Sequence, residues 1–113
     1  MKLKEAIQKA DFQRPNTIDE ELKAHWVMGL ECEIAELMKV DVPECLWPED
    51  QELLMPAPKD EIYVLYLMSK IDLTNEEIDV YQNDAVTANQ AITEAKQWWY
   101  RLYGDPAVKY VRV

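Results

Sequence analysis

The amino-acid sequence predicts an all-α protein, a small bundle of three to four helices with a proline-rich packed loop and a short C-terminal strand-like tail. Apolar side chains recur every three or four residues over long stretches, which is the spacing of one face of an α-helix. Only two glycines occur among the 113 residues, Gly29 and Gly104, too few for the many tight turns of a β-sandwich or barrel. Apolar residues make up 49% and charged residues 30%, a mixture that favours an ordered domain over a disordered chain. The length corresponds to one domain, residues 1–113, with 105–113 as an extended tail.

Two helices are expected in the first third of the chain. The first covers about residues 2–11, where one helical face is apolar at Leu3, Ala6, Ile7 and Ala10. Pro15 ends it, because proline disfavours a helical conformation in the residue before it. Thr17 is the expected N-cap of the second helix, 18–39, and the acidic residues that follow suit the positive end of the helix dipole. Its apolar stripe consists of Leu22, Trp26, Leu30, Ile34 and Leu37.

A proline-rich segment, residues 41–58, follows the second helix. Four prolines in this segment rule out a continuous helix. The segment also contains several large apolar side chains, which a freely solvated linker would lack. We therefore expect a loop that packs on the helices, with one short helical turn at 49–54.

Two further helices are expected in the second half. The third begins at about Pro58 and is apolar around nearly its whole circumference, which is typical of a central, buried helix. Thr74 and Glu77 form a capping-box pattern for the fourth helix, which runs to about Tyr103 with Gly104 at its C-terminal cap position. The apolar stripe of the fourth helix is the most regular in the chain: Ile78, Tyr81, Ala85, Ala88, Ile92, Ala95, Trp99 and Leu102.

The last six residues, 108–113, alternate apolar and polar side chains with β-branched types, which predicts one short strand. A single strand leaves its backbone groups unpaired, and no second strand is evident elsewhere in the sequence. Two interpretations stay open. The tail either adds a strand to a partner protein, or it is a docked or frayed terminus.

The net charge is −10, and the acidic residues are concentrated in the middle of the chain. Residues 15–95 contain four basic against nineteen acidic side chains, whereas 1–14 and 96–113 are both net basic. An acidic body repels a phosphate backbone, so specific nucleic-acid binding is not expected. We interpret the negative charge chiefly as a means of keeping the protein soluble. The alternative is that the basic ends of one copy pair with the acidic middle of another copy.

No arrangement of residues in the sequence indicates catalysis, a metal or another cofactor. His25 is the only histidine, and it lacks the Glu-x-x-His partners of a helical di-metal site. Cys32 lies two helical turns from His25, too far for a nucleophile–base pair, and both Cys32 and Cys45 are expected to be buried free thiols. The paired carboxylates fall mostly at helix starts, where the helix dipole explains them. We expect a protein that is not an enzyme, has no cofactor, and does not cross a membrane.

A cluster of aromatic and cationic residues at the end of the fourth helix is the candidate partner interface. Tryptophan, tyrosine and arginine are the residue types that dominate interface hot spots. The candidate residues are Trp98, Tyr100, Arg101, Tyr103, Lys109, Tyr110, Val111 and Arg112. The equally weighted alternative is a helix end covered by the N-terminal segment and the tail.

The order of several short motifs resembles that of a known family. The motifs are Arg14-Pro15-Asn16, Trp26, Leu53-Leu54-Met55-Pro56-Ala57-Pro58, Asp60-Glu61-Ile62-Tyr63, Tyr66-Leu67, Ile71-Asp72, Glu76-Glu77 and Tyr81-Gln82-Asn83. In this order, over about residues 1–103, the chain resembles small proteins from the structural gene clusters of tailed bacteriophages and prophages of Gram-positive bacteria, which are similar to head–tail connector (adaptor, head-completion) proteins. It departs from that pattern at Lys59, where an aromatic residue is usual, and at Gln82, where asparagine is usual.

The resemblance implies a structural virion protein, assembled in the cytoplasm of the bacterial host. It implies a helical subunit in a ring of about a dozen copies between portal and tail, with portal and tail proteins as partners and no catalytic residues. The ring of such proteins often forms only on its template, so the isolated subunit can be a monomer. An acidic body suits this role, because the negative charge of the channel wall repels the phosphate backbone and lets DNA slide through without binding.

Two other functions compete with the connector. The acidic middle is also compatible with a small helical regulatory or inhibitor protein that binds a basic partner. A metal-carboxylate enzyme is the third hypothesis, based only on the abundance of carboxylates.

Overall fold

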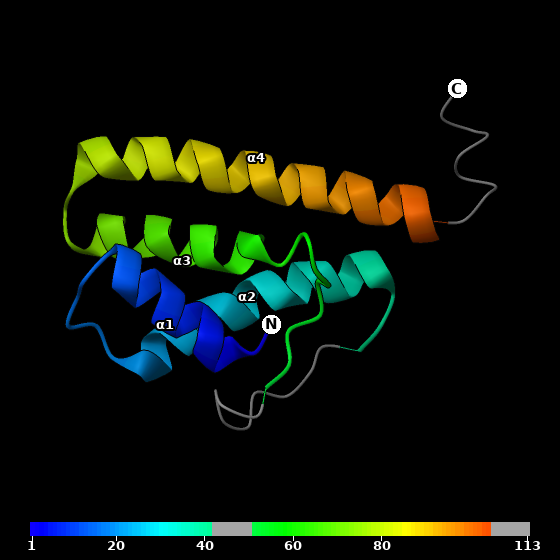
Figure 1. Ribbon diagram of the computed structural model, residues 1–113, viewed down its shortest axis with the longest axis horizontal. Coiled ribbons are helices and arrows are strands. Elements are labelled where there is room, and N and C mark those ends of the chain that lie inside the picture. The colour runs from blue at the N-terminus through cyan, green and yellow to red at the C-terminus, as the bar shows by residue number, and fades with distance from the viewer. Residues whose placement is uncertain (42–50, 105–113) are drawn as a thin grey trace.

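The computed structural model describes residues 1–41 and 51–104, which form four α-helices. The helices are α1 (Leu3–Gln13), α2 (Glu20–Met38), α3 (Glu61–Thr74) and α4 (Ile78–Tyr103). Figure 1 shows α4 lying along one side of α3, with α1 and α2 on the other side. The all-helical fold predicted from the spacing of apolar residues is therefore confirmed for the described part of the chain.

Helix α3 is the centre of the bundle and packs against each of the other three helices. Tyr63, Leu67 and Ile71 are fully buried along it, and Ile62 is 2% exposed. A helix that is apolar around its circumference can bury all of its sides only in this position. The expectation of a central third helix is thus confirmed.

The start of α2 differs from the prediction. The N-cap is Asp19, and Thr17 is exposed and lies outside the helix. No side chain caps the first turn of α2; instead, the Oδ1 of Asn16 accepts a hydrogen bond from the backbone N–H of Ile18, ahead of the helix, at 3.0 Å. This Asx-type turn redirects the chain before the helix starts, so the helix begins two residues later than predicted.

The expected capping box at the start of α4 is also wrong. Thr74 is the last residue of α3, where its hydroxyl donates to the carbonyl oxygen of Lys70 at 3.0 Å. Glu77 occupies the N-cap position of α4 without a side-chain capping bond. Backbone hydrogen bonds hold the short turn between α3 and α4 instead. Glu76 adopts the left-handed conformation, with φ 59°, and the N–H of Glu77 donates a hydrogen bond to the carbonyl oxygen of Asp72. Because α3 continues to Thr74, this hydroxyl is no longer available to α4.

Between α2 and α3 the structure describes residues 39–41 and 51–60. The backbone at residues 51–53 runs antiparallel to the N-terminal residues of the chain. The N–H of Leu3 donates to the carbonyl oxygen of Gln51, and the N–H of Leu53 donates to the carbonyl oxygen of Met1. Residues 51–54 are therefore extended, and the helical turn expected at 49–54 is absent from that part. Leu53 and Met55 are buried in the core. Residues 42–50 and the predicted strand-like tail, 105–113, lie outside the described residues.

Within the described ranges, no helix combines the length and the apolar character that crossing a membrane requires.

Candidate functional site

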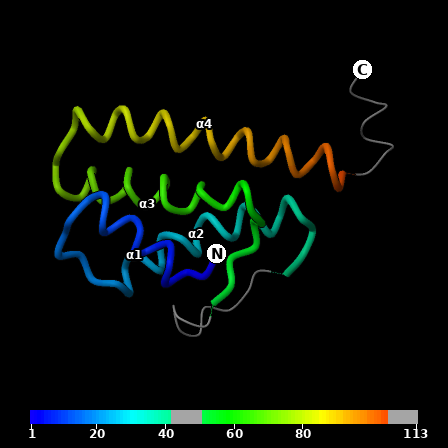
Figure 2. Tube along the Cα trace, in the orientation of Figure 1, coloured from blue at the N-terminus to red at the C-terminus, as the bar shows by residue number. Residues whose placement is uncertain are grey.

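The candidate site is the C-terminal end of α4. This helix has 26 residues, against 14 in α3 on which it packs. Only Ala88, Ile92 and Ala95 are buried along it. Figure 2 shows the last turns of α4 running past the end of α3, so this part of the helix has less of the bundle to pack against.

The large side chains at this end divide into two groups by their exposure. Trp98, Trp99 and Tyr100 are half-buried, and the two tryptophans pack against the edge of the core. Leu102 and Tyr103 are 57% and 62% exposed. The ring centroids of Trp99 and Tyr103 lie 5.3 Å apart, with the ring planes inclined at 42°, so one residue of each group packs against the other. A large aromatic surface that is partly anchored and partly exposed can bind another protein without extensive rearrangement.

The structure places the predicted interface residues as follows. Arg101 and Tyr103 are exposed, whereas Trp98 and Tyr100 are half-buried. The other four predicted residues, Lys109, Tyr110, Val111 and Arg112, lie outside the described residues. The described half of the predicted interface therefore lies on the last two turns of α4, with two of its four side chains exposed.

A charged cluster links the α1–α2 connection to the α3–α4 hairpin. The Nε of Arg14 lies 3.1 Å from a carboxylate oxygen of both Asp72 and Asp84, and its Nη2 lies 2.8 Å from Asp84. Asp72 is 1% exposed, and its Oδ2 has no hydrogen-bond partner. Burial raises the pKa of Asp72 to about 7, the neighbouring Asp84 adds to this rise, and Arg14 opposes it.

A second buried polar group lies in the core between α2, α3 and the extended segment. Glu31 is fully buried and accepts hydrogen bonds from the hydroxyl of Tyr63 (2.5 Å) and the N–H of Leu54 (2.9 Å). The same hydroxyl accepts from the N–H of Met55 at 2.8 Å. Burial raises the pKa of Glu31, while its two hydrogen bonds lower it. Burial also raises the pKa of Tyr63, so its hydroxyl stays protonated as the donor.

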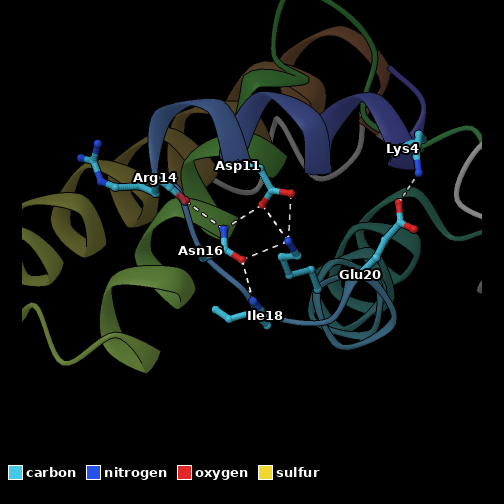
Figure 3. A network of polar contacts seen from close by, with 7 residues as sticks. Lys4, Asp11, Arg14, Asn16, Ile18 and Glu20 are labelled. Atoms are coloured by element: carbon cyan, nitrogen blue, oxygen red, sulfur yellow. Dashed lines mark hydrogen bonds and ion pairs between the residues drawn. The ribbon is translucent and has the colours of Figure 1, made fainter.

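The turn after α1 contains a third network, shown in Figure 3. The amide of Asn16 donates to Asp11 and to the carbonyl of Arg14, both at 2.9 Å. The ammonium of Lys23, which is 3% exposed, lies 2.8 and 2.9 Å from the two carboxylate oxygens of Asp11. A buried ammonium paired with a carboxylate holds α1 and α2 in a defined relative position.

All three networks connect helices and are nearly complete in their hydrogen bonds, so we assign them to the fold. In the sequence, Arg14, Asn16 and Asp72 stand out only as members of short motifs, and no pattern marks Glu31. Glu31 and its hydrogen-bond partner Leu54 are 23 residues apart in the sequence, and Arg14 and its ion-pair partner Asp84 are 70 residues apart. Local spacing cannot reveal pairs at that separation.

The residues considered for chemistry lie apart from these networks. His25 and Cys32 are both exposed on α2, so the expectation of a buried Cys32 is wrong. That helix turns residue 32 to solvent, because its core-facing stripe runs through Leu30 and Ile34. Among the described residues, no group of three or more His, Cys, Asp or Glu side chains is arranged to hold a metal ion.

Comparison with protein-family models, with curated proteins and with solved structures found no match to this chain.

Proposed function

We propose that this chain is a structural virion protein, a head–tail connector subunit that joins portal to tail through protein–protein contacts. The observation that carries the proposal is the end of α4, where exposed Leu102 and Tyr103 continue the half-buried surface of Trp98 and Trp99. Aromatic residues next to a cation, Arg101, form the type of surface that dominates protein interfaces. The resemblance to phage connector proteins supplies the class of partner.

Four of the eight motifs that carry this resemblance contain residues of the networks that hold the helices together. Arg14 and Asn16 belong to the first motif, Tyr63 to the fourth and Asp72 to the sixth. We therefore propose that these motifs specify the packing of the helices rather than a binding surface. The interface at the end of α4 lies outside these motifs, and we propose that it determines which partner is bound.

The proposal is tested by complementation of a phage that lacks this gene. Tyr103→Asp with Arg101→Glu should give DNA-filled heads without tails, counted by electron microscopy, because charge reversal at an interface centre opposes binding. Phe12→Asp is the matched control, since Phe12 is an exposed aromatic residue on α1, 85% exposed. Wild-type assembly by the α4 variant, together with no binding of the purified wild-type chain to portal or tail rings, would refute the proposal.

The acidic body favours a second candidate, a regulatory or inhibitor protein that binds a basic partner. Glu21, Glu33 and Glu36 are exposed along α2, and a dense acidic surface can attract a basic protein. Affinity purification from an infected or prophage-bearing cell separates the two candidates. Recovery of a nuclease or repressor instead of virion proteins would favour the second one.

A further inference from the structure

A cleft of about 540 Å³ lies between α2 and α4. Its apolar lining comes from Leu30 of α2, Tyr66 of α3 and Ile92 of α4, of which Leu30 and Ile92 are buried and Tyr66 is half-buried. Glu33 and Lys96 also line it, with their charged groups 3.7 Å apart. Glu33 is 62% exposed, so this ion pair contributes little to stability and can rearrange. The cleft therefore suits a segment that brings apolar side chains and a positive charge.

Gly29 borders this cleft, in the interior of α2. A glycine at such a position destabilises a helix relative to alanine. Its φ is not positive, and a Cβ at this position would meet no atom within 4 Å among the described residues. Neither the conformation of α2 nor its packing explains the glycine. Glycine is typical of sites where a second backbone comes close, so Gly29 indicates that a chain segment approaches α2 here.

The other glycine, Gly104, lies where the chain leaves α4. Its backbone is extended. A Cβ there would overlap the carbonyl oxygen of Tyr100 and lie 2.9 Å from its ring. The chain therefore leaves the helix close against Tyr100. Tyr100 lies one helical turn from Lys96, which lines the cleft, and residues at this spacing share a helix face. A segment that turns back at Gly104 would reach the cleft along that face.

The segment that follows has the length that this path requires. Residues 107–113 lie outside the described residues, and an extended chain of this length spans about 23 Å. Along α4, Gly104 is about 22 Å from Asn89, the first residue of this helix to line the cleft. Pro106 prevents α4 from continuing and favours a change of direction before the segment begins. Residues 107–113 can therefore run back along α4 as far as the end of the cleft.

The side chains of this segment match the cleft in pattern and charge. Val111 and Val113 lie on one side of an extended chain and can cover the apolar lining. Arg112, on the other side, can pair with Glu33. Because the segment is tethered at Gly104, its effective concentration at this cleft is on the order of millimolar, which favours the same chain over another copy. We infer that residues 107–113 fold back along α4 and occupy the α2–α4 cleft of their own chain.

The lining of the cleft also offers partners for the backbone of an extended segment, whose polar groups need hydrogen bonds. Asn89 and Thr93 are exposed on α4 and line the cleft, and their amide and hydroxyl groups can donate and accept. On its way the docked segment would pass Tyr103, which follows Tyr100 at helical spacing and belongs to the proposed interface. A partner at the end of α4 would then displace the segment. This consequence rests on the proposed function, whereas the docking does not.

NMR of the isotope-labelled full chain tests the docking from the side of the tail. In the wild type, the tail amides should have heteronuclear NOE values close to those of the helices. Val111→Asp with Val113→Asp places charges against the apolar lining, so it should lower these values and shift the amide signal of Gly29. The matched control is Val108→Asp with Tyr110→Asp, which makes the same charge change on the opposite side of an extended chain and should shift that signal far less.

Filling the cleft tests the docking from the other side. Gly29→Phe should place a ring in the cleft and expose the tail, so trypsin should cut after Lys109 about tenfold faster than in the wild type, measured by mass spectrometry. The rate of cleavage follows the population of the undocked form. Cys32→Phe is the matched control, since Cys32 is exposed on the same helix and does not line the cleft. Urea unfolding checks that both variants are folded.

Three outcomes would each overturn the inference. They are a tail that is mobile in the wild type, equal effects of the two members of either variant pair, and a signal of Gly29 that changes on about tenfold dilution, which would assign the contact to a second copy. All of these measurements use the isolated chain. Docking of the tail in a chain that binds no portal or tail ring would therefore refute the connector and leave this inference standing.

Discussion

Replacing Asp72 by asparagine should remove a loss of stability that the wild-type protein undergoes as the pH rises from about 4 to 7. Asp72 is 1% exposed, and it shares Arg14 with a second carboxylate, Asp84. Burial, followed by the neighbouring Asp84, raises its pKa from 3.8 to about 7, and Glu77 adds a smaller repulsion. The folded state therefore binds a proton more tightly than the unfolded state does.

The sign follows from this difference in proton binding. Between the two pKa values the folded state holds more protons than the unfolded state, so the free energy of unfolding falls as pH rises and is constant above the folded pKa. The two pKa values of Asp72 are about three pH units apart, and each unit corresponds to ~1.4 kcal/mol. The loss of free energy of unfolding across this range therefore has an upper limit of ~4 kcal/mol. The side chains of Arg14 and Asp84 are 26% and 17% exposed, and water at this edge screens the cluster. We therefore expect a loss of about 2 kcal/mol.

The assay is urea unfolding, followed by the fluorescence of the four tryptophans, at a series of pH values. The pKa of buried Glu31 is raised in the same direction, so the quantity to compare is the difference between wild type and Asp72→Asn. Asp79→Asn, at an exposed carboxylate on α4, is the control and should follow wild type. Identical pH profiles for wild type and Asp72→Asn, or a wild-type stability that rises from pH 4 to pH 7, would refute the reasoning.

Three further predictions concern the other networks and the exposed surface. Tyr63→Phe should lower the free energy of unfolding by about 1–3 kcal/mol, measured in urea, because it leaves the fully buried Glu31 without its hydroxyl donor; a loss below about 0.5 kcal/mol would contradict this. Asp11→Ala should cost about 1–2 kcal/mol, because the ammonium of Lys23 loses its carboxylate but keeps the Oδ1 of Asn16 at 3.1 Å, and the side chain of Asp11 is 38% exposed; Asp11→Asn should lose less, and equal losses would contradict the ion-pair explanation. Phe12→Ala should change thermal stability by less than about 0.5 kcal/mol, because the ring is 85% exposed; a large loss would show that the ring is packed.

Periodicity was sufficient for the helices and insufficient for their ends. The stripe from Ile78 to Leu102 predicted a helix that the structure gives as Ile78–Tyr103, because a 3.6-residue spacing is read from the chain alone. The caps depend on how far the preceding helix continues. Thr74 was expected to cap α4 and instead lies inside the last turn of α3, since the packing of α3 extends that helix to the turn.

The candidate site was predicted only in part, for a similar reason. The aromatic and cationic residues of Trp98 to Tyr103 were evident as a cluster in the sequence. Which of them is exposed depends on the length of α3 relative to α4, and this is a property of the packed bundle. The exposure of Cys32 also depends on packing. The contacts of Leu30 and Ile34 with the core fix the rotation of α2 about its axis, and this rotation turns Cys32 to solvent.

The sequence by itself determined the helical class, the order of the four helices and the central position of the third, because these depend on local spacing and on the total apolar content of each segment. The tertiary structure decided which charges meet. Arg14 and Asp84 are 70 residues apart in the chain, and Glu31 meets Tyr63 across 32 residues. A buried charge is stable only with its partner in place, and that partner is brought near only when the helices pack.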